Sequence, residues 1–434
     1  MSSPDAVRTS DAAVLVGSIP VHCEVLSRDE AIEQAKRIKV LSLSCVGFTL
    51  SFAAWLMFGV LGIPIQQEFQ ISDVSLSWLV AVAILNGSIW RLAFGMLADR
   101  WGGKVTFVSL LVLSGVSSFL VSSSQSYEQL FLYAFLVGIG GNCFSVGSAW
   151  NAAWFPPKQQ GFAMGLFGAG NVGASVTKLI GPALIALVPT AGLFGGWIPG
   201  GWRFVPFLYG CLLLLMAVAV AWIAPSPDKK PGAGRSLGAM LLPLKEIRVW
   251  RFALYYTVVF GVYVAMSACL PKYYVSVYKL PLGTAALLTT PFIFASSLLR
   301  PLGGWLSDRL GPRKVTYGVF ILGSLMSLVL FLPLTVTQFT VCIVLLGITQ
   351  GIGKASTIKY IPEYYPKDVG AVVGLVGALA ALGGFAMPPL FAYLKQWTGQ
   401  PQSMFWVVFG ITATSLIWLH MVVRGIRRTE TQSI

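Results

Sequence analysis

The most regular feature of the chain is a series of long apolar segments separated by short polar ones. Each apolar segment has about 20 residues, enough for a helix to cross roughly 30 Å of hydrocarbon. The pattern therefore predicts an all-α membrane protein with twelve transmembrane helices. The predicted spans are residues 39–65, 76–98, 105–124, 128–153, 161–189, 203–224, 250–275, 283–307, 315–333, 338–360, 370–394 and 403–423.

Composition agrees with a chain that lies in a lipid bilayer. Of its 434 residues, 56% are hydrophobic and only 11% are charged, which is more apolar surface than one soluble core could bury. The first 37 residues or so are polar, so we expect no cleavable signal peptide. The net charge of +14 is better explained by membrane topology than by nucleic acid, which we do not expect as a partner.

The cysteines are scattered and indicate neither a disulfide framework nor a metal site. Five of the six lie within predicted spans, where packing explains them. They are Cys23, Cys45, Cys143, Cys211, Cys269 and Cys342.

The basic residues predict the orientation. Of the 30 Lys and Arg, 21 lie in the two tails and the even-numbered loops, and four lie in the odd-numbered loops. By the positive-inside rule both termini face the cytoplasm, and we expect the protein in the cytoplasmic (inner) membrane. The predicted organisation is a tail (1–37), a six-helix half (38–224), a basic linker (225–249), a second six-helix half (250–424) and a short tail (425–434).

The remaining five basic residues fall within or near the spans, and no Asp or Glu falls clearly inside one. An ionisable group inside a span is costly and is usually functional. Because these basic residues have no carboxylate partner within the spans, we expect an anionic substrate to supply the opposite charge. The five are Arg91, Lys178, Arg300, Lys354 and Lys359. Lys359 lies near a predicted helix end and could instead extend its amine to the membrane–water interface.

The chain contains an internal repeat with an offset of 209 residues. "RLAFGMLADRWGGK" begins at Arg91, and "RPLGGWLSDRLGPRK" begins at Arg300. The same offset relates Gly138 to Gly347 and Pro157 to Pro366. The repeat predicts two related six-helix halves in parallel orientation, with the substrate between them near the midplane.

The loop pattern D-R-x-G-x-(x)-K occurs after spans 2 and 8 and resembles the signature loop of the major facilitator superfamily. The resemblance covers both halves. It implies structural or gating roles at the cytoplasmic ends of the helices, without substrate contact, for Asp99, Arg100, Lys104, Asp308, Arg309 and Lys314.

The two arginines that begin the repeats are predicted to face each other. Each lies eight residues before the Asp of its loop, which places it roughly 12 Å inside the cytoplasmic edge. Two guanidinium groups would approach in a low dielectric only with an anion between them. Their planar forks suit a planar oxyanion such as nitrate, nitrite or bicarbonate better than tetrahedral sulfate or phosphate.

Two glycine-rich stretches, 161–178 and 347–388, resemble the nitrate-signature regions of the nitrate/nitrite porter (NarK-type) family. The resemblance implies substrate binding by Arg91 and Arg300, with Asn171 as the signature asparagine. Aromatic residues implied near the substrate are Tyr256, Phe260 and Phe144, although each could be plain packing. Glycines implied to provide smooth helix surfaces are Gly161, Gly165, Gly168, Gly173, Gly370, Gly374 and Gly377.

The sequence departs from the exchangers of that family at "GIGKAS", where Lys354 stands in place of an Asn. A proton symporter needs a group that titrates, and arginine does not lose its proton. Neither His22 nor His420 lies near the midplane. Lysines lose a proton readily when desolvated, so the proton-coupling candidates are Lys354, Lys178 and Lys359, and an acidic residue at a loop edge, Glu363, could contribute.

These features predict a secondary transporter that imports nitrate by proton symport, with nitrite as a second possible substrate. Nitrate/nitrite exchange on the same scaffold is the main alternative, and a nitrate sensor that no longer transports is a weaker one, because the tails are too short for a signalling domain. An enzyme, an ATP-driven pump and a channel are disfavoured because the chain shows no catalytic set, no P-loop and a duplicated architecture. We expect a monomer without cofactor or metal.

Overall fold

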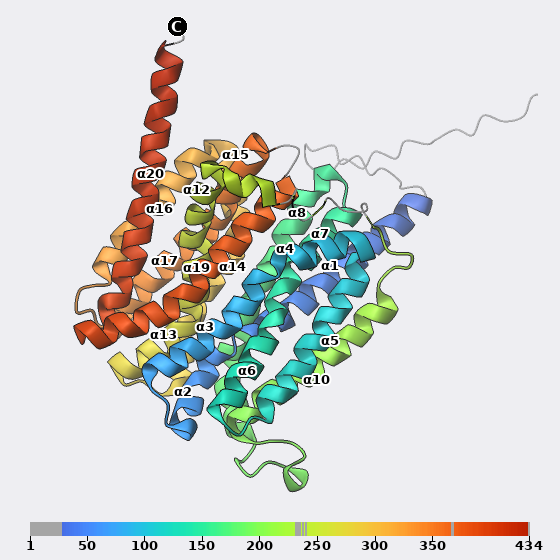
Figure 1. The fold of residues 1–434 in the computed structure, drawn as a ribbon, viewed down its shortest axis with the longest axis vertical. Helices are drawn as coiled ribbons and strands as arrows, with labels where there is room; N and C mark the ends of the chain where they lie inside the picture. The colour runs from blue at the N-terminus through green and yellow to red at the C-terminus, as the bar shows by residue number, and fades with distance from the viewer. Residues whose placement is uncertain (1–27, 231–235, 237, 239–240, 366–368, 433–434) are drawn as a thin grey trace, which may run out of the picture.

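The computed structural model describes residues 28–230, 236, 238, 241–365 and 369–432, and these residues form a bundle of helices joined by short loops (Figure 1). In the described part, the β-type pairing is a single isolated bridge between Leu193 and Ile198. Helices dominate because a helix satisfies all its backbone hydrogen bonds within one segment, as a lipid environment requires. The predicted all-α membrane fold is confirmed.

The first half runs from α1 to α10. Its helices are α1 (Arg28–Trp55), α2 (Phe58–Phe69), α3 (Asp73–Ile89), α4 (Arg91–Trp101), α5 (Gly103–Ser122), α6 (Tyr127–Val137), η1 (Gly138–Asn142), α7 (Cys143–Trp154), α8 (Pro157–Gly168), η2 (Ala169–Val172), α9 (Gly173–Leu187) and α10 (Phe204–Ile223).

The second half runs from α12 to α20. Its helices are α12 (Ile247–Tyr256), η6 (Thr257–Gly261), α13 (Val262–Tyr278), α14 (Leu282–Leu298), α15 (Arg300–Leu310), α16 (Pro312–Val329), α17 (Val336–Ile358), α18 (Tyr360–Tyr364), α19 (Val369–Thr398) and α20 (Met404–Gln432).

The helices follow the predicted spans, but one of them, α16, is less apolar than a membrane span usually is. Within the described ranges, ten helical stretches are long and apolar enough to cross a membrane, and the pair α14 and α15, bent by 42°, is an eleventh if it counts as one span. The predicted span 315–333 corresponds to α16, which begins at Pro312 and has Arg313 and Lys314 next in the chain. These charges in its first turn make it less apolar than the others.

The first and last helices extend beyond the predicted boundaries of the two six-helix halves. The first helix, α1, begins at Arg28 rather than near residue 38, and Asp29 and Glu30 in its first turn suit the positive end of the helix dipole. The last helix, α20, continues to Gln432, beyond the predicted start of the tail at 425. Both helices therefore extend past the expected membrane boundary.

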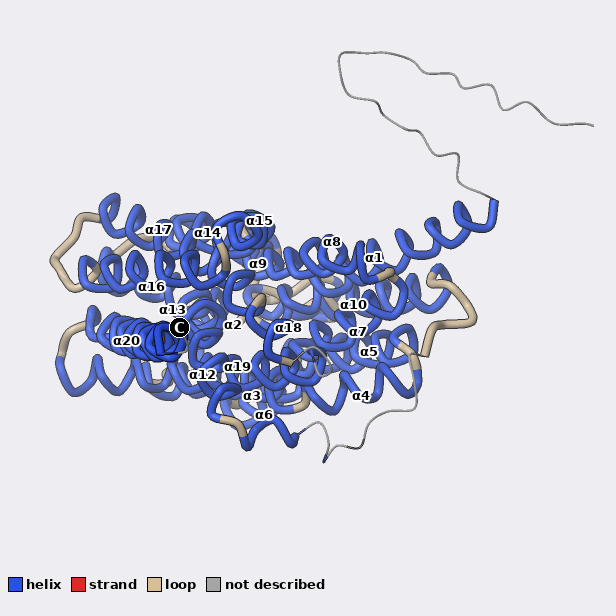
Figure 2. The backbone as a smooth tube through the Cα atoms, turned by 90° about the horizontal axis from the view of Figure 1, so that it is seen from above, coloured by secondary structure: helices blue, strands red, loops and turns tan. Residues whose placement is uncertain are grey.

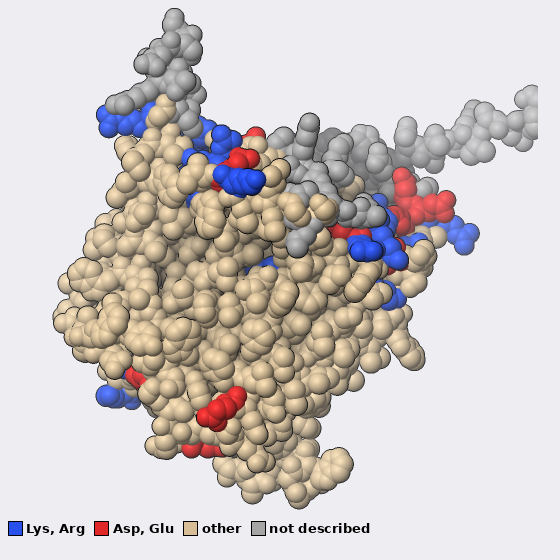
Figure 3. Space-filling view, viewed as in Figure 1, with Lys and Arg blue, Asp and Glu red and all other residues tan. Residues whose placement is uncertain are grey.

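The two halves lie side by side and meet along pairs of helices from opposite halves (Figure 2). Extensive contacts join α3 to α19 and α14 to α9, and further contacts join α2 to α13. Charged side chains gather near the two ends of the bundle, and the face between them is almost free of charge (Figure 3). The bundle thus has an apolar belt, two polar ends and a central interface.

The repeat seen in the sequence is also a structural repeat. Both α4 and α15 have 11 residues and begin with the arginine of the repeat. Both end at a glycine with positive φ, which is 98° at Gly102 and 85° at Gly311. That conformation is favoured only for glycine, so the same residue stops both helices and turns the chain into the next span.

Candidate functional site

Arg91, the first residue of α4, is buried at the interface between the halves, with 2% of its surface exposed. Its Nε donates to the carbonyl oxygen of Gly87 at 2.9 Å, and its Nη1 lies 3.5 Å from the carbonyl oxygen of Gly377 on α19. Its Nη2 is buried and has no hydrogen-bond partner among the described residues. Since a guanidinium has five N–H donors, Arg91 has donors left for an anion.

The Phe144 ring contacts both arginines of the repeat. The Cζ atom of Arg91 is 5.7 Å from the centroid of the Phe144 ring, and the Cζ atom of Arg300 is 5.9 Å from the same centroid. The rings of Trp55 and Phe260 also lie 5.8 and 5.2 Å from Arg91 Cζ. These cation–π contacts stabilise the charges but leave them unneutralised. Both arginines therefore contact one aromatic ring, and their facing each other across a substrate stays a prediction.

Each arginine reaches the same glycine position of the opposite half. Gly168 on α8 and Gly377 on α19 are related by the repeat. A Cβ at Gly168 would lie 2.5 Å from Arg300 Nη1, and a Cβ at Gly377 would lie 3.8 Å from Arg91 Nη1. The glycines therefore leave room for the guanidinium groups at the interface.

Tyr256 and Phe260 line this group from the second half. Their rings stack with centroids 5.4 Å apart and an interplanar angle of 12°. Phe260 lies in η6, a single π-helical turn between α12 and α13. Such turns are frequent at functional sites, and this one aims the Phe260 ring at Arg91.

Asn171 is buried in η2 with 1% exposure, and its Oδ1 has no hydrogen-bond partner in the described part of the chain. Its backbone carbonyl accepts a hydrogen bond of 2.9 Å from the hydroxyl of Tyr263 on α13. The same hydroxyl lies 3.3 Å from Ser297 Oγ on α14. Tyr263 thus joins Asn171 of the first half to two helices of the second.

Lys354 is fully buried on α17, and its ammonium belongs to the same group. Its Nζ donates to the carbonyl oxygen and to the Oγ of Ser296, both at 2.9 Å. It also lies 3.4 Å from the ring centroid of Tyr263. Ser296 is four residues before Arg300, across the bend between α14 and α15. Lys354 lies within electrostatic range of Arg300, without a carboxylate between them in the described contacts.

Lys178 and Lys359, the other two lysine candidates, occupy different surroundings. Lys178 on α9 is buried with 1% exposure, and its Nζ has no hydrogen-bond partner among the residues described. Lys359, which ends α17, forms an ion pair with Asp308 on α15. The structure therefore does not bring Lys359 to the arginines.

The loops predicted for gating make contacts near the end of the bundle that holds the C-terminus. The backbone N–H of Lys104 donates to Asp228 Oδ2 at 2.7 Å, and its Nζ donates to Ala224 O and Ser226 Oγ at 2.9 Å each. In the second half Arg309 stacks on Trp305 with Cζ 4.3 Å from the centroid. Asp99 and Arg100 lie in the last turn of α4, and Lys314 lies in the first turn of α16.

Asp228, in the linker, is a contact residue that the sequence analysis missed. Its Oδ1 accepts hydrogen bonds of 3.0 Å from Trp150 Nε1 and Trp154 Nε1, and its Oδ2 accepts the Lys104 N–H. The beginning of the linker is therefore fixed to the first half. No sequence signal singled out Asp228, because its partners come from helices far away in the chain.

The predicted glycines differ in their surroundings. Gly165 and Gly374, another pair related by the repeat, would meet no atom within 4 Å if a Cβ were added, and the same holds for Gly95 and Gly304. A Cβ at Gly173 would instead lie 2.1 Å from the Thr49 carbonyl oxygen, so Gly173 serves close packing. The surroundings of Gly161 and Gly370 lie outside the described side chains.

Tyr263, Ser296 and Trp55 were also missed by sequence reasoning. Tyr263 follows Tyr256 by seven residues, a spacing that places both on one face of a helix, and this signal was available. Ser296 and Trp55 carry no such signal, because their contacts with Lys354 and Arg91 depend on which helices are neighbours.

The site as a whole is a buried cationic group lined by aromatic rings. No ion pair described for the chain involves Arg91, Lys178 or Lys354. Among the residues that the structure describes, no group of three His, Cys, Asp or Glu could hold a metal ion. Such a site can bind a small anion between two helical halves.

Comparisons with known proteins agree with this description. The family model of the Major Facilitator Superfamily matches residues 43–295 and 278–433. A "Probable nitrate/nitrite antiporter NarK1" of Thermus thermophilus is 56% identical over 93% of this chain and 95% of its own length. A "Nitrite extrusion protein" of Bacillus subtilis (strain 168) is 28% identical over 91% of this chain and 97% of its own. A "Probable nitrate transporter NarT" of Staphylococcus carnosus is 29% identical over 87% and 95%.

A solved structure supports the fold alone. A bacterial homologue of the human lysosomal transporter Spinster, in an inward-facing and occupied conformation, has a TM-score of 0.71 at 17% identity and covers 89% of this chain and 97% of its own. The family match and the similarity to the Thermus relative place the chain among membrane transporters rather than enzymes. The chain belongs to the NarK/NarT family of the major facilitator superfamily, which confirms the predicted family.

Proposed function

We propose that this protein imports nitrate across the cytoplasmic membrane by alternating access around Arg91 and Arg300, driven by proton symport. The observation that carries the proposal is the reciprocal arrangement of the two arginines. They share the Phe144 ring, and each lies against the glycine of the opposite half, Gly377 or Gly168.

Nitrate matches the chemistry of this site. It is planar, carries one negative charge and has three acceptor oxygens, so two guanidinium forks can each donate to it in its plane. The free Nη2 of Arg91 and the aromatic rings of Phe144 and Phe260 suit a flat anion. Nitrite has the same charge and planarity and is the second expected substrate, in keeping with the names of the relatives.

Alternating access follows from the interface. With no anion present, the two guanidinium charges oppose approach of the halves, and a bound nitrate offsets this repulsion. Gly165 and Gly374 flank the interface on α8 and α19, with open space where a side chain would lie. The two halves can then rock about the bound anion, with the termini in the cytoplasm.

Proton coupling is assigned to Lys354, with Lys178 as the second candidate. A symported proton needs a titratable group near the anion, and the charged side chains in the described contacts of the site are lysines and arginines. Lys354 is fully buried, donates to Ser296 and lies within electrostatic range of Arg300. A lysine that is neutral in the empty site and protonated when nitrate arrives would carry one proton per cycle.

Nitrate/nitrite exchange on the same site is the alternative, and the name of the Thermus relative favours it. An exchanger swaps one monovalent anion for another, so its site keeps a constant charge. Under this alternative Lys354 and Lys178 stay protonated and only raise the affinity for anions.

Uptake of labelled nitrate into proteoliposomes distinguishes the two. One set of vesicles receives an inward proton gradient without internal substrate, and the other contains nitrite without a gradient. Uptake driven by the gradient alone supports symport. Uptake that requires internal nitrite and does not respond to the gradient supports exchange. If neither set of vesicles takes up nitrate, the proposal of nitrate transport is wrong.

A further inference from the structure

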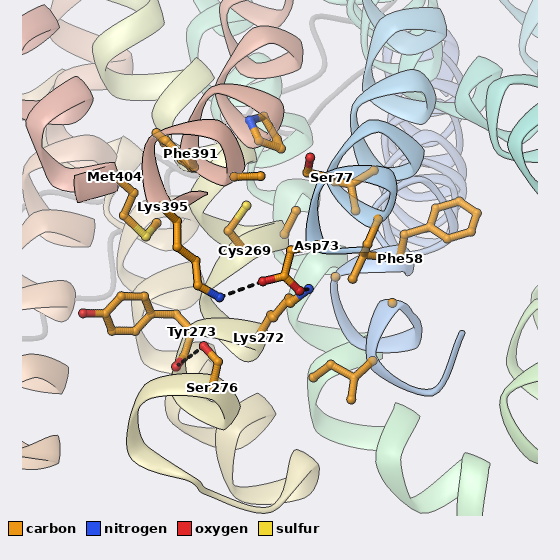
Figure 4. A pocket seen from close by; sticks show the side chains of 18 of the residues that line it. Phe58, Asp73, Ser77, Cys269, Lys272, Tyr273, Ser276, Phe391, Lys395 and Met404 are labelled. Carbon is orange, nitrogen blue, oxygen red and sulfur yellow. Dashed lines mark hydrogen bonds and ion pairs between the residues drawn. The ribbon is translucent and has the colours of Figure 1, made fainter. Parts of the chain in front are cut away.

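A second cationic cluster lies at the end of the bundle opposite the C-terminus, where Asp73, Lys272 and Lys395 meet (Figure 4). Asp73 Oδ1 accepts a hydrogen bond of 2.6 Å from Lys272 Nζ, and Asp73 Oδ2 accepts one of 2.7 Å from Lys395 Nζ. The carboxylate thus gives one oxygen to each ammonium group. Two cations and one anion leave the cluster with a net charge of +1.

The cluster joins the two halves of the protein. Asp73 is the first residue of α3 in the first half, whereas Lys272 lies on α13 and Lys395 on α19 in the second. Gln66 on α2 bridges the contact, because it donates to Asp73 at 2.9 Å and accepts from Lys272 at 2.8 Å. Opening this end of the interface would therefore separate Asp73 from both lysines.

Water and small solutes can reach the cluster. The side chains of Lys272, Asp73 and Lys395 are 25%, 40% and 36% exposed. All three line two cavities, one of about 500 Å³ and one of about 100 Å³, and the smaller extends to Cys269. The cluster therefore stands at the mouth of a space that leads into the interface.

Lys178 is a further positive charge near the cluster, and it is buried. Cys269, which lines the smaller cavity, lies within electrostatic range of both Lys272 and the buried Lys178. Its Nζ is buried and has no hydrogen-bond partner in the described chain. Seven residues before it on the same face is Asn171, at the level of the central arginines.

We propose that Lys272 and Lys395 form an outer binding site for the transported oxyanion, and that the Asp73 carboxylate occupies this site while the end is closed. The proposal rests on the anion-transport function proposed above. A carboxylate and nitrate are both planar and share one negative charge over their oxygens. Asp73 therefore acts as a tethered competitor, and its departure leaves two ammonium groups ready for an anion that next meets Lys178.

The test uses Cys269 as a reporter in a full-length variant whose other cysteines are replaced by serine. Proteoliposomes are exposed, on the side opposite the termini, to a thiol reagent that does not cross membranes. Asp73→Asn removes the charge that holds the halves together at this end. We expect Cys269 to react at least about five-fold faster, as for the loss of partly exposed ion pairs.

Glu68→Gln is the matched control. Glu68 is also at this end and pairs with Arg203 at 2.7 Å, but both residues belong to the first half. Its loss should leave the rate of Cys269 labelling within about two-fold of the parent, since no contact between halves is removed. Equal rates for Asp73→Asn and its parent would overturn the closing role of Asp73.

Binding is read from protection by nitrate. Saturating nitrate should slow the labelling of Cys269 in Asp73→Asn, whereas sulfate at equal ionic strength should not. Adding Lys272→Gln and Lys395→Gln should abolish the protection. Protection that persists without both lysines, or that is absent with them, would overturn the outer site.

Protection of Cys269 by nitrate, measured with Arg300→Lys added, distinguishes the outer site from the proposed central site at Arg91 and Arg300. Nitrate bound only at the arginines would lose its protective effect in that variant, which would count against the outer site. Protection that survives while uptake is lost supports both sites. If Arg300→Lys keeps full uptake, the central site fails, and the outer site is still judged by the lysine variants.

Discussion

The Nη1 atom of Arg91, in the first half, lies 3.5 Å from the carbonyl oxygen of Gly377 in the second half. The repeat makes Gly168 the counterpart of Gly377, and Gly168 lies directly against Nη1 of Arg300. Each guanidinium group therefore lies against the backbone of the opposite half. Movement of one half relative to the other changes the surroundings of both guanidinium groups at once, which is what a transport site at an interface requires.

Arg91→Lys and Arg300→Lys should each reduce nitrate uptake strongly. Lysine keeps the charge but loses the planar fork, and with it about 1.5–3 kcal/mol of charge-assisted hydrogen bonding. We expect kcat/KM for nitrate to fall by about ten- to a hundred-fold. Arg424→Lys, at an exposed position of α20, is the control. Full activity in either arginine variant would exclude a role for the fork.

Gly168→Ala should impair transport more than Gly377→Ala. The added Cβ would lie 2.5 Å from Arg300 Nη1 at the first position and 3.8 Å from Arg91 Nη1 at the second. Only the first forces the guanidinium to move. The measurement is KM for nitrate in proteoliposomes, with exposed Gly318→Ala on α16 as the control. Equal KM values in the two variants would mean that the arginine positions do not set affinity.

Lys354→Gln should uncouple nitrate movement from protons. The substitution leaves a polar side chain for Ser296 but removes the ammonium that would take up a proton. We expect proton-driven uptake to be lost, while exchange of external nitrate for internal nitrite continues. Lys230→Gln in the linker is the control. If Lys354→Gln and Lys178→Gln both retain full proton-driven uptake, neither lysine carries the proton.

Gly102→Ala and Gly311→Ala should lower stability by about 1–2 kcal/mol each, because both glycines have positive φ. The loss should be larger for Gly102, where a Cβ would lie 2.8 Å from Asp228 Oδ2, than for Gly311, where it would meet nothing within 4 Å. Thermal unfolding in detergent gives the order. Gly410→Ala, in open space on α20, should not lower stability, because Ala is favoured over Gly inside a helix. A neutral Gly311→Ala would contradict the strain argument.

The class of fold and the equivalence of the two halves can be read from the sequence alone. Apolar segments of membrane length predict helices because lipid leaves the backbone no other partners. A constant offset of 209 residues predicts that α4 and α15 are equivalent, and both helices begin with an arginine and end at a glycine with positive φ. These properties depend on local composition and periodicity, which are readable along the chain.

The contacts between side chains depend on the packing of the helices and cannot be read from the sequence. Phe144 was named from a family resemblance, but its contact with both Arg91 and Arg300 results from the packing of three separate helices. Tyr263 reaches both Asn171 and Lys354, and Lys359 turns instead to Asp308. Such contacts depend on helix rotation and on which helices of opposite halves are neighbours. The pattern of apolar residues constrains neither of them, because the interface and the lipid face of a membrane helix are both apolar.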